Sequence, residues 1–478
     1  IDTFFLEYIR GGCDRKGGED MAEYPSKKYE IDMCSGSIFK KLLLFSFPLM
    51  CSGMLQLLFN AAGIVVVGQY AGKEALAAVG STSALINLFT NVFIGISVGA
   101  NVLTARFCGA GRQDEIKQTV HTSMAVALVS GLLLMVVGVV VAPILLGMMG
   151  TPESSLGLAV LYIRIYFIGM PAMMVYNFGS AILRAVGDTR RPLFYLLSAG
   201  VVNVGLNLLF VIVFHMSVAG VALATIISQM ISAMLIVRCL IKEKGSIHLN
   251  LREIRIHIGT MLKILQIGLP AGVQGTLFSL SNVFIQSSVN IFGDIVVAGN
   301  SAASSLEGFV YVAMNAVYQA TISFVSQNVG AMKYERINRI VLTSQVIVMV
   351  IGVALGNGVF IFGRFLLGLY SNEVPVIDAG MVRLAYICTT YALCGMMEVM
   401  VGALRGIGYS VMPMIVSLMG ACVFRLVWLA TVFQMEQFHR IEVVFVSYPV
   451  SWLLTLGVHI LCFLIVRRKV ERKVSEPA

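Results

Sequence analysis

Charged residues are scarce in this chain. Asp, Glu, Lys and Arg make up 12% of its 478 residues, whereas soluble domains carry about 25%. Apolar residues make up 58%, and the mean hydropathy is +0.87. This balance excludes an ordinary soluble protein and predicts an integral membrane protein.

Motifs for metal, disulfide and enzyme chemistry are also missing. The nine cysteines form no CxxC pair, and the six histidines form no HxxxH pair. GISVG (95–99) fits the G-x-S-x-G elbow, but that motif needs a strand-to-helix turn, and here it lies inside a long apolar run. Gly95 and Gly99 predict a small-residue seam for close helix packing instead. We therefore expect no enzyme, no cofactor and no resident metal.

Long apolar runs are what the chain has in their place. Each approaches the roughly 20 residues that a helix needs to cross a bilayer, and barrel strands are excluded because they alternate over only about ten residues. We predict an all-α membrane fold with twelve transmembrane helices. The runs are 42–67, 76–105, 118–146, 157–182, 192–214 and 218–241, then 262–291, 297–327, 340–367, 379–403, 413–433 and 441–466.

The second half of the chain repeats the first. AILRAVGDTRRP (181–192) matches GALRGIGYSVMP (402–413) at a spacing of 221 residues. We predict two six-helix lobes related by a pseudo-twofold axis, an N-lobe over 38–241 and a C-lobe over 262–470. Such repeats are typical of transporters that rock two halves around a central site.

Basic residues set the expected orientation. They gather in the even-numbered linkers, the central linker and the C-terminal tail, which predicts that both termini are cytoplasmic. This distribution accounts for the net charge of +9 without a nucleic-acid partner. We expect residues 1–37 to be a disordered cytoplasmic segment and 471–478 a cytoplasmic tail. The linker 242–261, polar on one side and apolar on the other, predicts a short amphipathic helix on the cytoplasmic surface.

Several charged side chains lie within the predicted helices, where each needs a cavity or a partner. Glu307 and Arg425 fall at similar depths from opposite ends of their helices, so we expect them to pair. Glu398 lies in the tenth helix. The two glutamates have two readings, a cation or proton site and a structural Glu–Arg contact. Arg383 lies near an outer helix end, where we expect it to snorkel to the surface.

Amide side chains form a second polar set inside the helices. An amide in hydrocarbon needs a partner, and Asn203 and Asn207, four residues apart, share one helix face. Each amide reads either as an interhelical hydrogen bond or as a wall of a substrate cavity. The remaining members are Asn60, Asn177, Asn315 and Gln319.

Two glycines follow arginines at matching turns of the repeat. Gly187 comes after Arg184, and Gly408 comes after Arg405. Glycine permits a tight turn, and the following proline starts the next helix. We read these positions as hinges or joints, with the arginines capping the helix ends.

Taken together, the motifs of the chain resemble those of multidrug and toxic compound extrusion (MATE) transporters, closest to the bacterial branch, over residues 38–470. The motifs are FPLMCSGMLQLLFNAAGIVVVGQYAGKEALAAVG (47–80), the LRAVGDTRRP and LRGIGYSVMP loops, and SQNVGA (326–331). The resemblance implies two lobes around a central cavity and cation-driven export by alternating access. Pro48 matches a kink proline of some members, and Pro270 is its counterpart in the repeat.

One position departs from the family pattern. Members commonly carry an acidic residue on the first helix where this chain has Gly63, and Asn207 is uncharged where some members carry Asp. The N-lobe therefore has no membrane-embedded carboxylate. If Na⁺ or H⁺ drives export, Glu307 and Glu398 must bind it. Gly63 and Arg425 join the amides as expected cavity residues.

The sequence thus predicts a monomeric exporter of amphipathic, often cationic small molecules in the cell membrane, working in exchange for Na⁺ or H⁺. Two alternatives stay open. One is a lipid-linked precursor flippase of the same superfamily, which buried arginines without acidic partners would favour. The other is a non-transporting membrane sensor that lost coupling at Gly63.

Overall fold

The computed structural model describes residues 29–149 and 153–475, and every regular element within them is a helix. The predicted all-α fold is confirmed. The N-lobe contains α2 (Ile38–Tyr70), α3 (Lys73–Gly109), α4 (Gln113–Met148), α5 (Glu153–Ile168), α6 (Met170–Ala185), α7 (Arg190–Leu208), the π-helix η1 (Leu209–Val213) and α8 (Ser217–Lys242). After the 3₁₀ turn η2 (Leu251–Glu253), the C-lobe contains α9 (Ile258–Asn290), α10 (Asp294–Gly330), α11 (Tyr334–Ile361), α12 (Gly363–Gly368), α13 (Val374–Ile387), α14 (Ala392–Ile407), α15 (Val411–Ser417), η3 (Leu418–Val423), α16 (Phe424–Ala430), η4 (Val432–Gln434), η5 (Glu436–Phe438) and α17 (Ile441–Ser475).

Each of the twelve predicted runs falls on one of these helices or on consecutive ones. Within the described residues, nine helices and two bent helix pairs are long and apolar enough to cross a membrane. The remaining predicted span is α9, which has 33 residues and includes the buried polar side chains of Gln274 and Ser281. It packs along α3 of the N-lobe, so part of its surface faces protein and has no need to be apolar.

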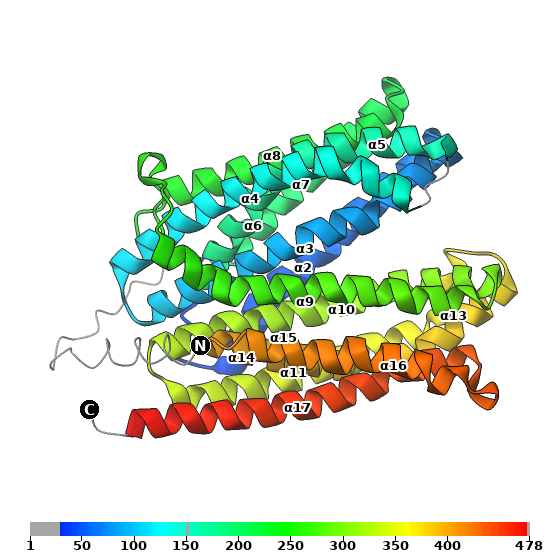
Figure 1. Ribbon diagram of the computed structural model, residues 1–478. Helices are drawn as coiled ribbons and strands as arrows, with labels where there is room; N and C mark the ends of the chain where they lie inside the picture. Colours follow the sequence, from blue (N-terminus) through cyan, green and yellow to red (C-terminus); the bar gives the residue numbers. More distant parts are fainter. Residues whose placement is uncertain (1–28, 150–152, 476–478) are drawn as a thin grey trace.

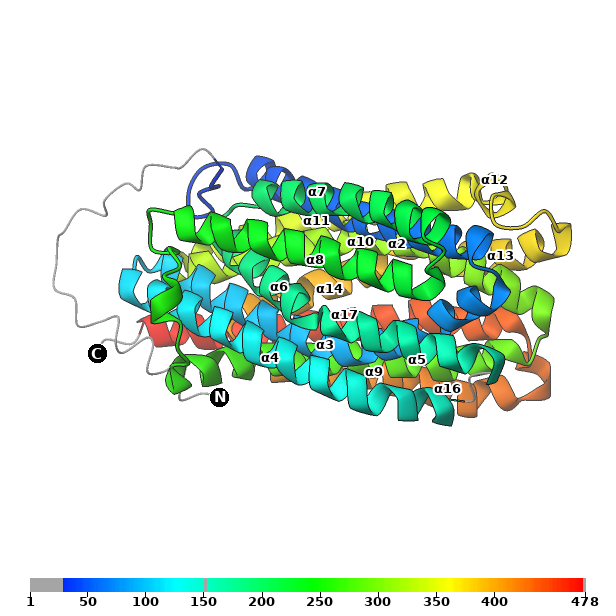
Figure 2. The same ribbon diagram turned by 90° about the horizontal axis from the view of Figure 1, so that it is seen from above.

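The two lobes lie side by side with their long helices running in one general direction (Figures 1 and 2). Helix α2 begins and helix α17 ends at the same end of the molecule (Figure 1). We call this the basic end, because Arg106, Lys242, Lys333 and Arg336 lie on the helix termini and turns there. From it the two groups of helices diverge towards the opposite end (Figure 1).

Two spans are broken at corresponding places in the repeat. Helices α5 and α6 meet at Gly169 with a bend of 47°, and α13 and α14 meet with a bend of 47°. The prolines expected to kink helices lie elsewhere: Pro48 is inside α2 and Pro270 is inside α9, and each helix runs unbroken over 33 residues. Their hinge role stays a prediction.

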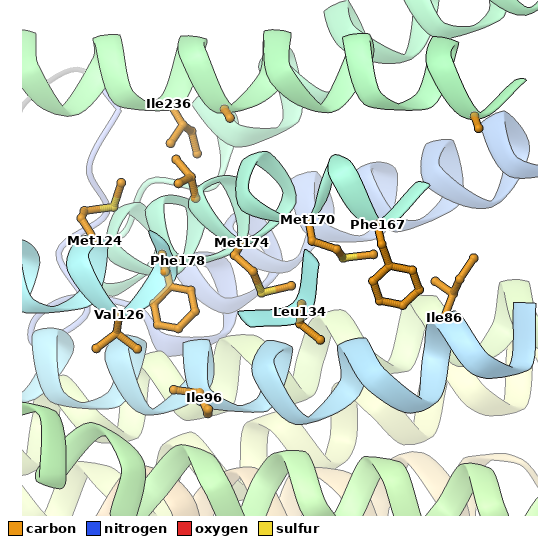
Figure 3. Close-up of a cluster of buried hydrophobic side chains, with 14 of the residues drawn as sticks. Ile86, Ile96, Met124, Val126, Leu134, Phe167, Met170, Met174, Phe178 and Ile236 are labelled. Atoms are coloured by element: carbon orange, nitrogen blue, oxygen red, sulfur yellow. The ribbon is translucent and has the colours of Figure 1, made fainter. Parts of the chain in front are cut away.

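Aliphatic side chains form most of the N-lobe core, together with methionine and phenylalanine side chains (Figure 3). Phe167, Met174 and Phe178 are fully buried and pack with residues of α3, α4 and α8. The packing is close: a Cβ on Gly138 would lie 2.0 Å from the Phe167 ring. The buried methionine and phenylalanine side chains of this region therefore act as core packing.

The linker between the lobes differs from the predicted amphipathic helix. In 242–261 the structure has only the ends of α8 and α9 and the short turn η2. Leu249 is buried against the N-lobe, and the Asn250 N–H donates to His121 Nε2 of α4 at 3.1 Å. Leu249 thus finds a protein surface, whereas Leu251, Ile256 and Ile258 stay exposed, and no α-helix forms between the end of α8 and the start of α9.

The terminal segments were also predicted too broadly. The expectation of disorder for residues 1–37 fails for 29–37, which are placed against both lobes, while residues 1–28 lie outside the described part of the chain. At the other terminus α17 continues to Ser475, so it includes most of the predicted tail, and residues 476–478 are again outside the described part.

Candidate functional site

Glu307 of α10 forms a buried ion pair with Arg383 of α13. Arg383 Nε and Nη2 donate to the two carboxylate oxygens, each at 2.7 Å, and Nη1 donates to Asn300 Oδ1 at 2.6 Å. The exposed fractions of Glu307 and Arg383 are 5% and 8%. The predicted Glu307–Arg425 pair is wrong, and so is the snorkelling of Arg383, because the planar guanidinium matches both carboxylate oxygens across the α10–α13 contact.

Arg425 of α16 has aromatic partners instead of an acid. Its guanidinium carbon lies 4.0 Å from the centre of the Tyr448 ring and 5.5 Å from that of Trp452, both on α17. Arg425 Nε donates to Ser451 Oγ at 2.8 Å. Ring faces attract a desolvated cation, so this buried arginine is held without a carboxylate, and its Nη2 has no hydrogen-bond partner among the described residues.

Glu398 of α14 has a different environment from Glu307. It is 9% exposed, and within the described residues it has no hydrogen-bond or ion-pair partner. Tyr311 and Tyr318 of α10 and Arg405 of α14 lie close enough to interact with it electrostatically. Arg405 itself is occupied, since it donates to Tyr318 Oη and, at 2.8 Å, to Gln274 Oε1. Among the described residues, Glu398 thus differs from Glu307 in having no directly bonded cation.

The N-lobe carries an uncharged polar cluster at the positions where the family resemblance implied acids. Asn207 Nδ2 donates to Asn203 Oδ1 at 3.1 Å, and Asn203 Nδ2 donates to Ser228 Oγ at 3.3 Å. Gly63 faces this chain, because a Cβ built on it would lie 3.7 Å from Asn207 Nδ2. The structure thus brings together three of the predicted residues, Gly63, Asn203 and Asn207, and a side chain at position 63 would point at the amides.

The other predicted cavity residues are separate from this cluster. Asn60 is exposed, and Asn177 Nδ2 donates to Met173 O of its own helix at 2.9 Å. Asn315 and Gln319 are half-buried on α10, one turn apart. Their role as a cavity wall stays a prediction.

At the basic end the lobes are joined through equivalent positions of the repeat. Arg106 Nη2 of α3 donates to Ile407 O at the end of α14, at 2.8 Å. Gln327 Nε2 of α10 donates to Ala185 O at the end of α6, at 2.7 Å. Close backbone packing of α3 on α10 accompanies these bonds: a Cβ on Gly330 would lie 1.9 Å from Arg106 O. The lobes are therefore closed at this end.

The turn glycines belong to the same closure. Gly187 and Gly408 have φ of +94° and +113°, values that favour glycine. A Cβ on Gly408 would lie 2.8 Å from Arg106 Nη2, so this glycine also leaves room for the guanidinium. The predicted capping role of Arg405 is wrong, because its side chain reaches sideways to α9 and α10. The hinge role of the two glycines stays a prediction.

The segment 29–37 lies across the closed end. The Ile31 N–H donates to Gly187 O of the N-lobe at 3.3 Å, while Met33 is fully buried against the C-lobe and its carbonyl accepts from Asn328 Nδ2 at 3.0 Å. Further bonds join Lys333 to Cys34 O, and Arg336 to Ser35 O and Gly36 O. The polar composition of this stretch gave no sign that it joins the lobes. Most of its hydrogen bonds are accepted by backbone carbonyls, which do not depend on the side chains present.

A second joint between the lobes runs along α3 and α9. A Cβ on Gly95 would lie 2.2 Å from Gly272 Cα, and a Cβ on Gly99 would lie 2.1 Å from Ile264 O. The small-residue seam predicted from these glycines is confirmed. Asn91 Nδ2 extends it with a hydrogen bond to Ser279 Oγ at 3.1 Å.

Comparison with known proteins follows this geometry. The family model described as MatE matches residues 48–209 and 270–430, one segment in each lobe. The chain belongs to the MatE family. The family is one of membrane transporters, and the resemblance predicted from the sequence motifs is confirmed.

Individual MatE relatives cover most of the chain. The probable multidrug resistance protein YoeA of Bacillus subtilis is 25% identical over 432 residues, which are 88% of this chain and 92% of YoeA. The FAD transporter of Shewanella oneidensis is 25% identical over 350 residues, 72% of this chain and 77% of that protein. A solved multidrug resistance MATE family transporter in an outward-facing conformation, 21% identical, has a TM-score of 0.87 and covers 94% of this chain and 99% of its own.

Proposed function

We propose that this MatE protein exports amphipathic, often cationic small molecules across the plasma membrane in exchange for Na⁺ or H⁺, working as a monomer. The MatE match and the relatives with multidrug resistance names support the class of activity. The basic end is cytoplasmic in this proposal, because of the positive-inside rule. The described conformation is then closed towards the cytoplasm, and transport requires the bonds of Arg106 and Gln327 to break.

The observation that carries the coupling proposal is the unpartnered carboxylate of Glu398. Desolvation makes a buried carboxylate without a partner costly, so it gains free energy by taking up a cation or a proton. Glu307 is already neutralised by Arg383, and a second cation there would meet the guanidinium. We therefore assign the coupling ion first to Glu398, and keep Glu307 as a second position that becomes available only if its ion pair opens.

Coupling to substrate has a route through helix α14. Glu398 and Arg405 lie on the same helix, seven residues apart, and Arg405 is bonded to α9 and α10. Helix α14 ends at Ile407, whose carbonyl accepts the bond from Arg106 of the other lobe. Neutralising Glu398 would weaken its electrostatic attraction to Arg405, which lies two residues before Ile407, the acceptor of the bond that closes the basic end.

Buried arginines favour one other substrate class. Arg405 and Arg425 are 4% and 6% exposed, and neither forms an ion pair with a carboxylate among the described residues. An anionic amphipathic substrate, such as the lipid-linked precursor of a flippase, would suit this charge. The relative from Shewanella oneidensis is named for transport of FAD, a molecule with phosphates. This remains the second candidate.

Dye accumulation in pump-deficient cells tests the proposal. Cells expressing the unaltered chain should retain less of a fluorescent cationic dye than cells with an empty vector. Glu398→Gln should abolish this difference at matched membrane levels. Asp378→Asn is the control and should keep the difference, because it removes a C-lobe carboxylate that is 51% exposed and is neither of the two coupling positions. Equal dye export by Glu398→Gln would contradict the coupling assignment, and export of an anionic dye alone would favour the second candidate.

A further inference from the structure

An apolar groove on the N-lobe ends at two basic side chains. It lies between α4, α6 and α8 and has a volume of about 460 Å³. Leu128, Ala172 and Val237 are among its apolar residues, one from each helix. Met234 and Ile241, also in its wall, are 59% and 37% exposed. The groove is therefore open to the surroundings of the bundle, and it is separate from the Glu398 and Asn207 clusters.

Arg238 and Lys242 supply the polar end of the groove. They are one helical turn apart on α8, on the same face as Met234. Both side chains are exposed, and neither has a hydrogen bond or an ion pair with any described residue. Lys242 is the last residue of α8, so the two cations lie at the basic end. From Lys242 to Met234 the groove runs about 12 Å along the helix axis, away from this end, at 1.5 Å per residue.

We propose that this groove binds one anionic phospholipid, with the phosphate between Arg238 and Lys242 and one acyl chain along Met234 towards Leu128. Charge complementarity selects the occupant. Two basic groups at the end of an otherwise apolar groove match a ligand with an anionic head and an apolar tail. Basic pockets between transmembrane helices bind anionic lipid head groups, and a guanidinium donates to phosphate oxygens in a forked geometry.

The position of the groove gives the bound lipid a structural role. Pro171 and Ala172 line it, and they directly follow the break at Gly169 where α5 and α6 bend by 47°. An acyl chain there contacts α6 just beyond the bend, while the head group is held by α8. The lipid thus stabilises the packing of α4, α6 and α8 around the broken span.

Native mass spectrometry of the purified full-length chain tests this proposal. Phosphatidylglycerol and phosphatidylcholine with the same acyl chains are the probes, each added at the same series of concentrations. We expect one phosphatidylglycerol molecule to bind at least about tenfold more tightly than phosphatidylcholine. Arg238→Gln/Lys242→Gln should abolish this preference. Lys40→Gln/Arg190→Gln should keep it, because these two exposed basic residues of the same lobe lie outside the groove.

Ala172→Phe supplies an independent arm, since it fills the groove and leaves both charges in place. It should weaken phosphatidylglycerol binding, and it keeps the test decisive if the charge variant does not fold. Undiminished binding in both groove variants would overturn the proposal, as would equal affinity for the two lipids.

Discussion

Arg106 and Gln327 occupy equivalent positions of the two repeats, 221 residues apart, and each donates a hydrogen bond to the last carbonyl of a helix in the opposite lobe. The bonds have lengths of 2.8 and 2.7 Å. Internal symmetry therefore gives the closed end two related contacts around one axis. Their chemistry is unequal, because one donor is a cation and the other is a neutral amide.

The first prediction concerns this inequality. Arg106→Ala should weaken closure more than Gln327→Ala, because a hydrogen bond from a charged group contributes about 1.5–3 kcal/mol and a neutral one about 1 kcal/mol. Arg106→Gln should fall between them. Spin-label distances between positions 190 and 339, in a chain whose own cysteines are replaced, would measure the open fraction. An open fraction that is unchanged in Arg106→Ala would show that the bond does not hold the lobes together.

The second prediction uses Cys34 as a reporter of the segment 29–37. Burial, and then the nearby Asp32 carboxylate, raise the pKa of the Cys34 thiol to about 11 from an ordinary 9.0. The thiolate is the reactive form, so alkylation of Cys34 near pH 8 should be about 100-fold slower in the native chain than in the denatured chain. Maleimide labelling followed by peptide mass spectrometry would measure both rates.

The same pKa shift sets a pH dependence for docking of the segment. Below pH 9 the thiol is protonated in the docked and undocked states. As pH rises towards 11, the undocked thiol ionises first, so docking is progressively lost. Arg336→Ala, which removes the bonds to Ser35 O and Gly36 O, should accelerate labelling at pH 8. Identical rates in native and denatured chains would refute the placement of Cys34.

The third prediction separates the two glutamates by stability. Glu307→Gln leaves Arg383 buried without its partner, and the expected loss is about 3–5 kcal/mol of the free energy of unfolding. Glu307→Gln/Arg383→Met should lose much less. Asp378→Asn is the matched control, because the Arg364–Asp378 pair is 68% and 51% exposed and should contribute about 0–1 kcal/mol. Denaturation in detergent measures all three, and a Glu307→Gln loss as small as the control's would rule out a stabilising role for the pair.

The fourth prediction concerns the missing acid of the N-lobe. Gly63→Asp should fold, because a Cβ at this position meets only ordinary contacts at 3.7 and 3.9 Å, with Asn207 Nδ2 and Val221. The new carboxylate would face the Asn203–Asn207 cluster. We expect Na⁺ to raise the thermal midpoint of Gly63→Asp by about 2 °C or more beyond its effect on Gly63→Ala. An equal Na⁺ effect on both variants would mean that an acid here creates no cation site.

Periodicity and repetition made the fold predictable from the sequence. The apolar runs of spanning length can be read from local sequence alone. The offset of 221 residues is found by comparing the chain with itself, so neither signal requires knowledge of packing. The Gly95/Gly99 seam was predictable for the same reason, since small residues four apart already define a flat helix face. The bend at Gly169 was not predicted although Gly169 and Pro171 mark it, because prolines also lie inside the unbroken helices α2 and α9.

Pairing of charged side chains was not predictable, because depth along a helix does not fix its rotation or its neighbours. Glu307 and Arg425 have matching depths, yet α10 presents Glu307 to α13 and thus to Arg383. Arg425 met two aromatic rings that no spacing rule had linked to it. The polar composition of residues 29–37 predicted disorder. Their docking depends on backbone carbonyls, which every sequence has.

Gradient-driven dye transport in proteoliposomes tests the central claim most directly, namely that Glu398 couples export to a cation. The unaltered chain and Glu398→Gln would be reconstituted at equal density, with an imposed Na⁺ or H⁺ gradient and an exported dye. We predict gradient-driven dye transport by the unaltered chain, and loss of that transport with retained dye binding in Glu398→Gln. Gradient-driven transport by Glu398→Gln at the unaltered rate would contradict the account.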